Sequence, residues 1–204
     1  MNIIQQIAII APPLLFALTI HEYSHGYIAF RLGDPTAKAM GRLTLNPLKH
    51  LDPLGTLALF IIHIGWAKPV PVDPRYFKNP HKDMIWVALA GPAANIITAL
   101  ASILLVKFLF IIAPILPRAI LEPLYFMLSW SIAINIILAV FNLLPIPPLD
   151  GSKVLMGIVP HRHASFLARI EPFGFIILIG LYYTGVLQKI LSPIMSFAEK
   201  IIAG

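Results

Sequence analysis

Long runs of apolar residues dominate the chain, and four of them are candidate membrane spans. A transmembrane helix needs about 20 predominantly apolar residues to cross the hydrocarbon core of a bilayer. The candidate runs cover residues 3–32, 84–113, 123–144 and 173–187. The pattern predicts an all-α polytopic membrane protein with about four to six membrane segments.

Three further segments have patterns that do not fit a simple span. Residues 54–64 are apolar but too few to cross, which predicts a re-entrant or interfacial segment. Residues 149–159 form another short apolar run and predict a helical turn or two beside the third span. Residues 188–202 mix three charged side chains with apolar ones, which predicts an amphipathic helix in the membrane interface.

The connection between the first two spans has the pattern of short strands. Residues 37–45 and 65–72 are short runs bounded by turn residues. Pro69 and Pro71 donate no hydrogen bond to a ladder, so they exclude a central strand. We therefore expect a small β-ribbon with a free edge at the membrane surface.

Composition and charge agree with a membrane protein and predict its orientation. Of the 204 residues, 58% are hydrophobic and 12% are charged, whereas soluble domains carry about 25% charged residues. Eight of the 15 Lys and Arg residues lie in segment 31–82, but Arg118 alone lies between the second and third spans. The positive-inside rule then puts segment 31–82 in the cytoplasm and the N-terminus outside. Membrane topology accounts for the formal net charge of +6, so nucleic acid is not an expected partner.

Residues 1–204 are expected to form one membrane domain. The N-terminal run lacks the basic start and the small-residue cleavage site of a signal peptide, so we expect it to be retained as the first span. The chain has no cysteine, so any zinc site must be built from His and carboxylate side chains.

A candidate metal site lies in the first span, where the sequence reads His21-Glu22-Tyr23-Ser24-His25. Residues i and i+4 share one face of a helix, so the two imidazoles can bind one Zn²⁺ ion. Glu22 between them is placed to act as a general base. A charged side chain on a membrane helix costs about 2.5–3.5 kcal/mol, which favours a functional role. At 1.5 Å per residue, however, His21 lies near the inner edge of the core, so an interfacial position without function stays an alternative.

A catalytic zinc ion needs a third protein ligand, and Asp150 is the best candidate. The charge distribution places Glu122 on the opposite side of the membrane, and Asp34 is too close to His25 in sequence to fold back easily. Asp150 follows the third span, which ends on the same side as the two histidines, and three prolines in 145–148 exclude regular helix there. Non-helical backbone at membrane depth is tolerated where it lines a cavity. An ordinary turn at Asp150 is the alternative.

Polar residues within the spans leave two readings open. Asn95 and Asn142 either join helices by hydrogen bonds or bind the substrate backbone and a developing oxyanion. For Asn135 the joining role is the better prediction. His63 could line the site, whereas His161 and His163 are expected to lie in a cytoplasmic connection without a role.

These motifs resemble the site-2 protease family of intramembrane zinc metalloproteases, in its short prokaryotic form without a PDZ domain. The matching segments, in the expected order, are residues 21–25, 91–95 and 142–151 together with 65–72, so the resemblance covers most of the chain. It implies that His21, His25 and Asp150 bind one zinc ion per chain and that Glu22 is the general base. It also implies that Asn142 and Asn95 help to hold the substrate.

The resemblance further implies that the chain cleaves transmembrane helices of other membrane proteins. We therefore expect the chain to be an integral membrane enzyme with its active site toward the cytoplasm. A membrane metal or ion transporter and an inactive scaffold are the alternatives. Iron also uses sites of two histidines and one carboxylate, so the metal could differ from zinc.

Overall fold

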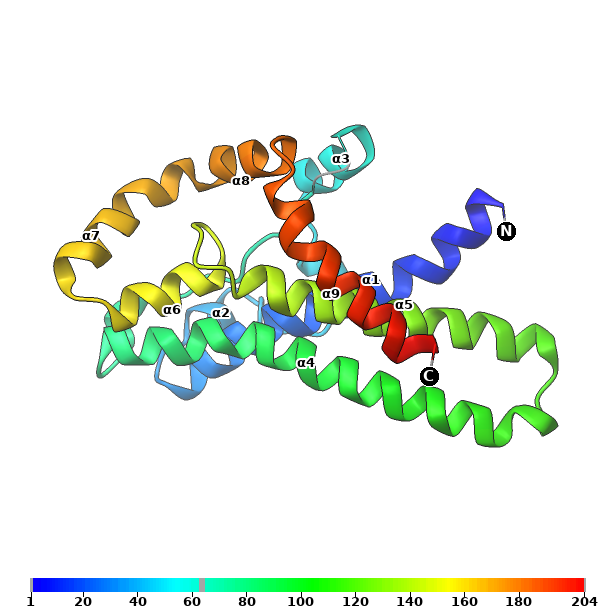
Figure 1. Ribbon diagram of the computed structural model, residues 1–204. Helices are drawn as coiled ribbons and strands as arrows, with labels where there is room; N and C mark the ends of the chain where they lie inside the picture. Colours follow the sequence, from blue (N-terminus) through cyan, green and yellow to red (C-terminus); the bar gives the residue numbers. More distant parts are fainter. Residues whose placement is uncertain (1, 63–64, 204) are drawn as a thin grey trace.

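Three long helices form the centre of the protein, as the computed structural model shows for residues 2–62 and 65–203. They are α1 (Ile3–Arg31), α4 (Pro80–Ile112) and α5 (Arg118–Asn142), which pack on one another (Figure 1). The apolar runs of the sequence give these helices, and the prolines inside α1 and α4 do not end them. The fold is 79% helical, and the described residues contain no sheet.

Shorter helices connect and follow the central three. The connection between α1 and α4 holds α2 (Thr36–Ala39), η1 (Pro47–Lys49), α3 (Pro53–Ile62) and η2 (Pro74–Tyr76). The rest of the chain holds η3 (Ala113–Ile115), α6 (Asp150–Ile158), α7 (His161–Ile170), η4 (Glu171–Phe173), α8 (Gly174–Tyr183) and α9 (Val186–Ala203). Helices α7 and α8 arch away from the centre, and α9 returns across α5 (Figure 1).

Four helical segments are long and apolar enough to cross a membrane. They are Ile3–Arg31, Pro80–Ile115, Arg118–Asn142 and Arg162–Tyr183. These four candidate spans agree with the prediction of about four to six membrane segments, but the fourth begins earlier than residue 173 because α7 and η4 continue directly into α8. It also ends earlier, since Gly185 adopts a positive φ of 74° between α8 and α9. The chain is thus a multi-pass membrane protein.

The predicted β-ribbon is not confirmed. Segment 37–45 begins inside the short helix α2. In the described part of this connection, strand pairing is limited to one isolated antiparallel bridge between Leu51 and Ala67. Prolines at 69 and 71 deprive segment 65–72 of two donors, which explains why no ladder extends from the bridge. Segment 54–64 overlaps α3, and its re-entrant position stays a prediction. His63 lies outside the described residues.

Buried contacts fix segment 65–72 beside α1. The carboxylate of Asp34 is fully buried and accepts hydrogen bonds from the backbone N–H groups of Thr36, at 2.9 Å, and Asp73, at 2.7 Å. Ala29 and Phe77 pack together with Val87 of α4. Asp34 therefore joins the two ends of the connection, and the segment just before Asp73 is held where its backbone can reach α1.

Candidate metal centre

His21 and His25 project from one face of α1 toward α4. Both are buried, at 6% and 8% exposure, and their Nε2 atoms lie 3.0 Å apart. The facing residue on α4 is Gly91, where a Cβ atom would lie 2.5 Å from His25 Nε2 and 2.7 Å from His21 Nε2. Glycine at this position leaves room for both imidazoles against the neighbouring helix.

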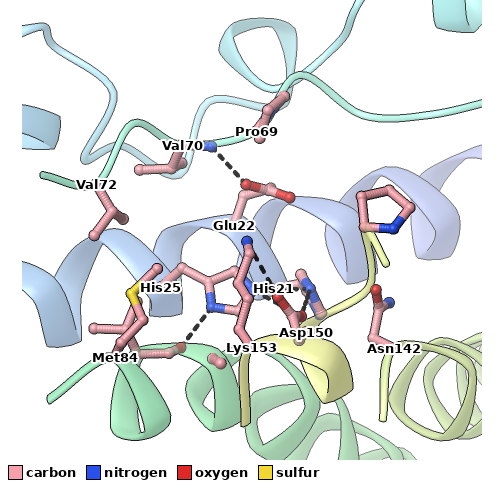
Figure 2. Close-up of a pocket in the computed structure, with 13 residues that line it drawn as sticks. His21, Glu22, His25, Pro69, Val70, Val72, Met84, Asn142, Asp150 and Lys153 are labelled. Carbon is pink, nitrogen blue, oxygen red and sulfur yellow. Dashed lines mark hydrogen bonds and ion pairs between the residues drawn. The ribbon is translucent and has the colours of Figure 1, made fainter. Parts of the chain in front are cut away.

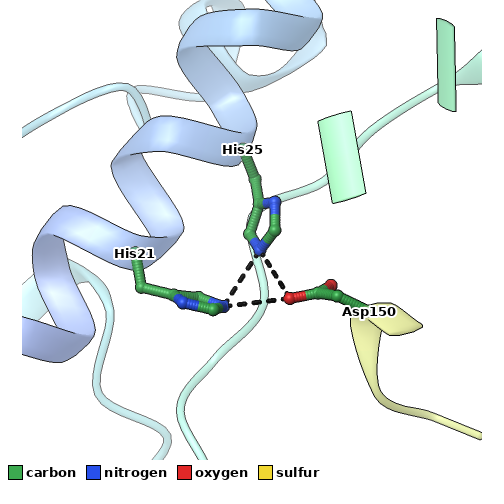
Figure 3. A group of neighbouring side chains, drawn as sticks. All are labelled: His21, His25 and Asp150. Atoms are coloured by element: carbon green, nitrogen blue, oxygen red, sulfur yellow. Dashed lines mark hydrogen bonds and ion pairs between the residues drawn. The ribbon is translucent and has the colours of Figure 1, made fainter. Parts of the chain in front are cut away.

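Asp150 completes the cluster from the first residue of α6. Its Oδ2 lies 3.1 Å from Nε2 of His21 and 3.1 Å from Nε2 of His25 (Figure 3). The proline-rich loop after α5 turns back tightly, since a Cβ atom on Gly151 would overlap the backbone of Leu143 and Leu144. This turn carries Asp150 to the two histidines of α1, more than a hundred residues away in sequence.

The three converging atoms suit a bound cation. His25 Nδ1 lies 2.6 Å from the carbonyl oxygen of Val87, which can only accept, so Nδ1 carries a proton and Nε2 offers its lone pair. Asp150 Oδ2 is buried and has no hydrogen-bond donor among the residues that the structure describes. Ligand atoms about 2.0–2.1 Å from a tetrahedral zinc ion lie about 3.3 Å apart, close to the 3.0–3.1 Å separations here.

Electrostatics keep the Asp150 carboxyl ionised. Burial would raise its pKa, but the nearby imidazoles of His21 and His25 outweigh burial and hold the pKa well below its usual value. Nζ of Lys153 lies 3.9 Å from Oδ1 of Asp150 and adds positive charge on the other side. An ionised carboxylate is the form that a metal ion requires.

Glu22 faces the cavity next to this cluster and is not one of the three converging groups. Its Oε2 accepts a hydrogen bond of 2.8 Å from the backbone N–H of Val70, so segment 65–72 lies over the site (Figure 2). The cavity measures about 280 Å³. It is lined by His21, Glu22, His25, Pro69, Val70, Val72, Met84, Val87, Ala88, Asn142, Pro148, Asp150 and Lys153.

The two predicted substrate-binding asparagines lie in different environments. Asn142, at the end of α5, lines the cavity as expected for such a role (Figure 2). Asn95 is fully buried in α4 and does not line the cavity; its Oδ1 lies 2.6 Å from Nδ1 of His21. The structure thus places Asn95 behind a candidate metal ligand and outside the residues that line the cavity.

Within residues 2–62 and 65–203, no second cluster of His, Asp and Glu side chains converges as His21, His25 and Asp150 do. His50 is buried and its Nε2 lies 2.8 Å from the carbonyl oxygen of Thr44, which gives it a structural role in the connection. His163 lies in α7, within the fourth candidate span rather than in a connection, and it does not line the cavity.

Known proteins resemble the chain over most of its length. The "Putative zinc metalloprotease YwhC" of Bacillus subtilis is 38% identical over 183 residues, which cover 90% of this chain and 84% of that protein. The "Putative zinc metalloprotease Rip2" of Mycolicibacterium smegmatis is 32% identical, covering 86% of this chain and 66% of that protein. The model of peptidase family M50 matches residues 111–182. The chain belongs to peptidase family M50, the site-2 protease family.

The M50 family match covers only part of the candidate metal centre, and the geometry of the site supplies the rest. The matched residues include the end of α5 and Asp150, whereas His21 and Glu22 lie outside them. No solved structure matches the chain. Family membership makes the chain a metalloprotease of the zinc-dependent kind, and the assignment of roles to individual residues rests on the converging side chains.

The structural roles of Gly91 and Val70 in this M50 protein were not predicted from the sequence. Gly91 and Asn95 are four positions apart in α4, so they share the face that packs on α1. That spacing is a signal that could have predicted contact with the histidine helix. The hydrogen bond from Val70 to Glu22 has no such signal, because it depends on how the connection folds over α1.

Replacing Gly91 with Ala should lower zinc affinity about 10- to 100-fold, the range seen when groups supporting metal ligands are disturbed. The new methyl group would overlap both imidazoles and push their Nε2 atoms apart. Competition with a chelator of known affinity measures the change. Gly180→Ala in α8 is the matched control, because a Cβ atom there meets nothing within 4 Å. Equal affinities for the two variants would contradict this packing role.

Proposed function

We propose that this M50 protein is an intramembrane zinc protease that hydrolyses peptide bonds within transmembrane segments of other membrane proteins. In this proposal His21, His25 and Asp150 hold one zinc ion per chain, and Glu22 is the general base. The observation that carries the proposal is the convergence of three metal-binding atoms within 3.0–3.1 Å beside a second acidic side chain, that of Glu22.

The residues of the site divide the chemistry between them. Zinc held there would polarise the scissile carbonyl and lower the pKa of water. Glu22 takes the proton from the attacking water and passes it to the leaving amine. The Val70 N–H bonds one carboxylate oxygen of Glu22, which keeps the side chain turned toward the cavity. Asn142 and Lys153, which both line the cavity, are positioned to bind the substrate backbone and its developing negative charge.

The surroundings of the cavity support a substrate that arrives from the membrane. The ligands lie near the cytoplasmic ends of α1 and α5 in the orientation that the Lys and Arg distribution favours. A buried helix hides its peptide bonds in intrahelical hydrogen bonds, so the substrate must unwind locally before cleavage. Segment 65–72 contains no helix, and its residues Pro69, Val70 and Val72 line the cavity, which makes it suitable for pairing with an unwound substrate strand.

Metal removal tests the function directly. The purified chain is reconstituted into liposomes with a model transmembrane substrate and treated with a zinc chelator. We expect cleavage to stop on chelation and to return when about one equivalent of Zn²⁺ per chain is added back. Zinc flux across the same liposomes without cleavage would favour a transporter. Neither cleavage nor flux, with zinc still bound, would favour an inactive scaffold.

A further inference from the structure

A row of buried polar side chains runs from His21 into the interface between α4 and α5. Asn95 and Asn135 have no exposed surface, and Ser102 and Ser131 are 4% and 7% exposed. Burying a polar group costs free energy unless it finds a hydrogen-bond partner. In a protein that is 58% hydrophobic, four such residues in one continuous line call for an explanation beyond packing.

The amide of Asn95 can adopt only one orientation. Its Nδ2 donates to the carbonyl oxygen of Ala17, at 3.1 Å, and to Oδ1 of Asn135, at 2.8 Å. Turning the amide over would set its oxygen against the carbonyl of Ala17, which cannot donate. Both N–H donors of Asn95 are therefore committed, and Oδ1 faces Nδ1 of His21 at 2.6 Å. This contact is a hydrogen bond only if His21 carries its proton on Nδ1.

The remaining hydrogen bonds fix which group donates and which accepts along the whole row. Ser102 Oγ donates its one proton to the carbonyl oxygen of Thr98, at 2.9 Å. The contact of 2.8 Å between the hydroxyls of Ser102 and Ser131 must then use the proton of Ser131. Nδ2 of Asn135 donates to the carbonyl and to the hydroxyl of Ser131, at 2.8 and 3.3 Å. This leaves Oδ1 of Asn135 as an acceptor for Asn95.

We propose that Asn95 is a positioning residue, held by Asn135, that locks His21 in the tautomer with its proton on Nδ1. The lone pair of Nε2 then points at the place where His25 and Asp150 converge. This inference rests on the proposed function, in which His21 binds zinc. This role differs from that of a residue that only joins helices. The row of hydrogen bonds orients the metal ligand His21 in addition to connecting α4 with α5. Metal-bound histidines commonly donate their second ring N–H to such a partner.

Two substitutions at Asn95 separate positioning from packing. Asn95→Leu removes the acceptor for His21 Nδ1, and zinc affinity should fall about 10- to 100-fold. Asn95→Asp keeps an acceptor for His21 but loses both donors, so the protein should unfold at lower temperature while zinc affinity stays near that of the wild type. A purely structural role would make the two readouts fall together in both variants.

The test measures Zn²⁺ affinity by chelator competition and the His21 tautomer from histidine ¹⁵N chemical shifts of the zinc-free protein. Ser129→Ala is the matched control, because Ser129 is buried on α5 and its hydroxyl has no hydrogen-bond partner in the described part of the chain; it should change neither readout. Asn135→Leu should weaken zinc binding less than Asn95→Leu, which provides a second variant if the latter fails to fold.

The possible outcomes distinguish the positioning role of Asn95 from the proposed function. Loss of zinc in His21→Ala together with unchanged affinity in Asn95→Leu would overturn the positioning role and leave the proposed function intact. A proton on Nε2 of His21 in the wild type would also overturn it. Unchanged zinc binding in His21→Ala would instead remove the metal site on which both inferences depend.

Discussion

Glu22→Gln should lower peptide-bond cleavage by about 10²- to 10⁴-fold, the contribution typical of a general base, while zinc stays bound. The carboxamide has nearly the shape of the carboxylate and still offers an oxygen to the N–H of Val70. It cannot take a proton from water at neutral pH. Glu22 is not one of the three converging groups, so its replacement should leave the metal in place. Cleavage of a transmembrane substrate and metal analysis on the same samples measure both effects.

The matched control is Glu199→Gln, since Glu199 is exposed on α9, outside the residues that line the cavity. This variant should keep wild-type cleavage and zinc content. Normal cleavage by Glu22→Gln would show that another group takes the proton. Loss of zinc from Glu22→Gln would make Glu22 a ligand rather than a base. The pair of readouts therefore separates the two roles that an acidic residue can have beside a metal.

The helices of this protein could be predicted because each needs only local information. Runs of apolar residues long enough to cross a bilayer gave α1, α4 and α5 within a few residues of their observed ends. The fourth span was placed too late, because the charged residues of α7 break the apolar run without ending the helix. The β-ribbon was predicted from short runs bounded by turn residues, but two prolines remove two backbone donors from segment 65–72, and the pairing stops at one bridge.

Part of the site could also be predicted from local rules. The i,i+4 spacing places His21 and His25 on one face, and the side of the membrane on which α5 ends points to Asp150. The structure brings these three groups together, and their binding of zinc stays a prediction. No such rule gives the rotation of α4 about its own axis relative to α1. Asn95 was therefore expected near the substrate, although it lies behind His21. Which face of α4 meets α1 depends on close packing at Gly91.

Asp150→Ala should remove zinc and cleavage together. Zinc bound by four protein ligands gains about 10–16 kcal/mol in small peptides, so one ligand contributes roughly 3 kcal/mol, or on the order of 10²-fold in affinity. The loss should be larger here, because two neutral imidazoles whose Nε2 atoms lie 3.0 Å apart would remain without the charge that attracts the ion. Metal content and chelator competition on the purified protein measure the effect.

Asp83→Ala is the matched control for this variant. Asp83 accepts a hydrogen bond from the N–H of Asn79 in the first turn of α4, and it belongs neither to the converging cluster nor to the residues that line the cavity. Its loss should cost about 1 kcal/mol of helix stability and leave zinc in place. Full zinc in Asp150→Ala would mean that a different group completes the site, and the short loop from Leu143 to Gly151 would then serve only to close the cavity. Zinc loss in both variants would point instead to general unfolding, which the thermal stability of each protein would reveal.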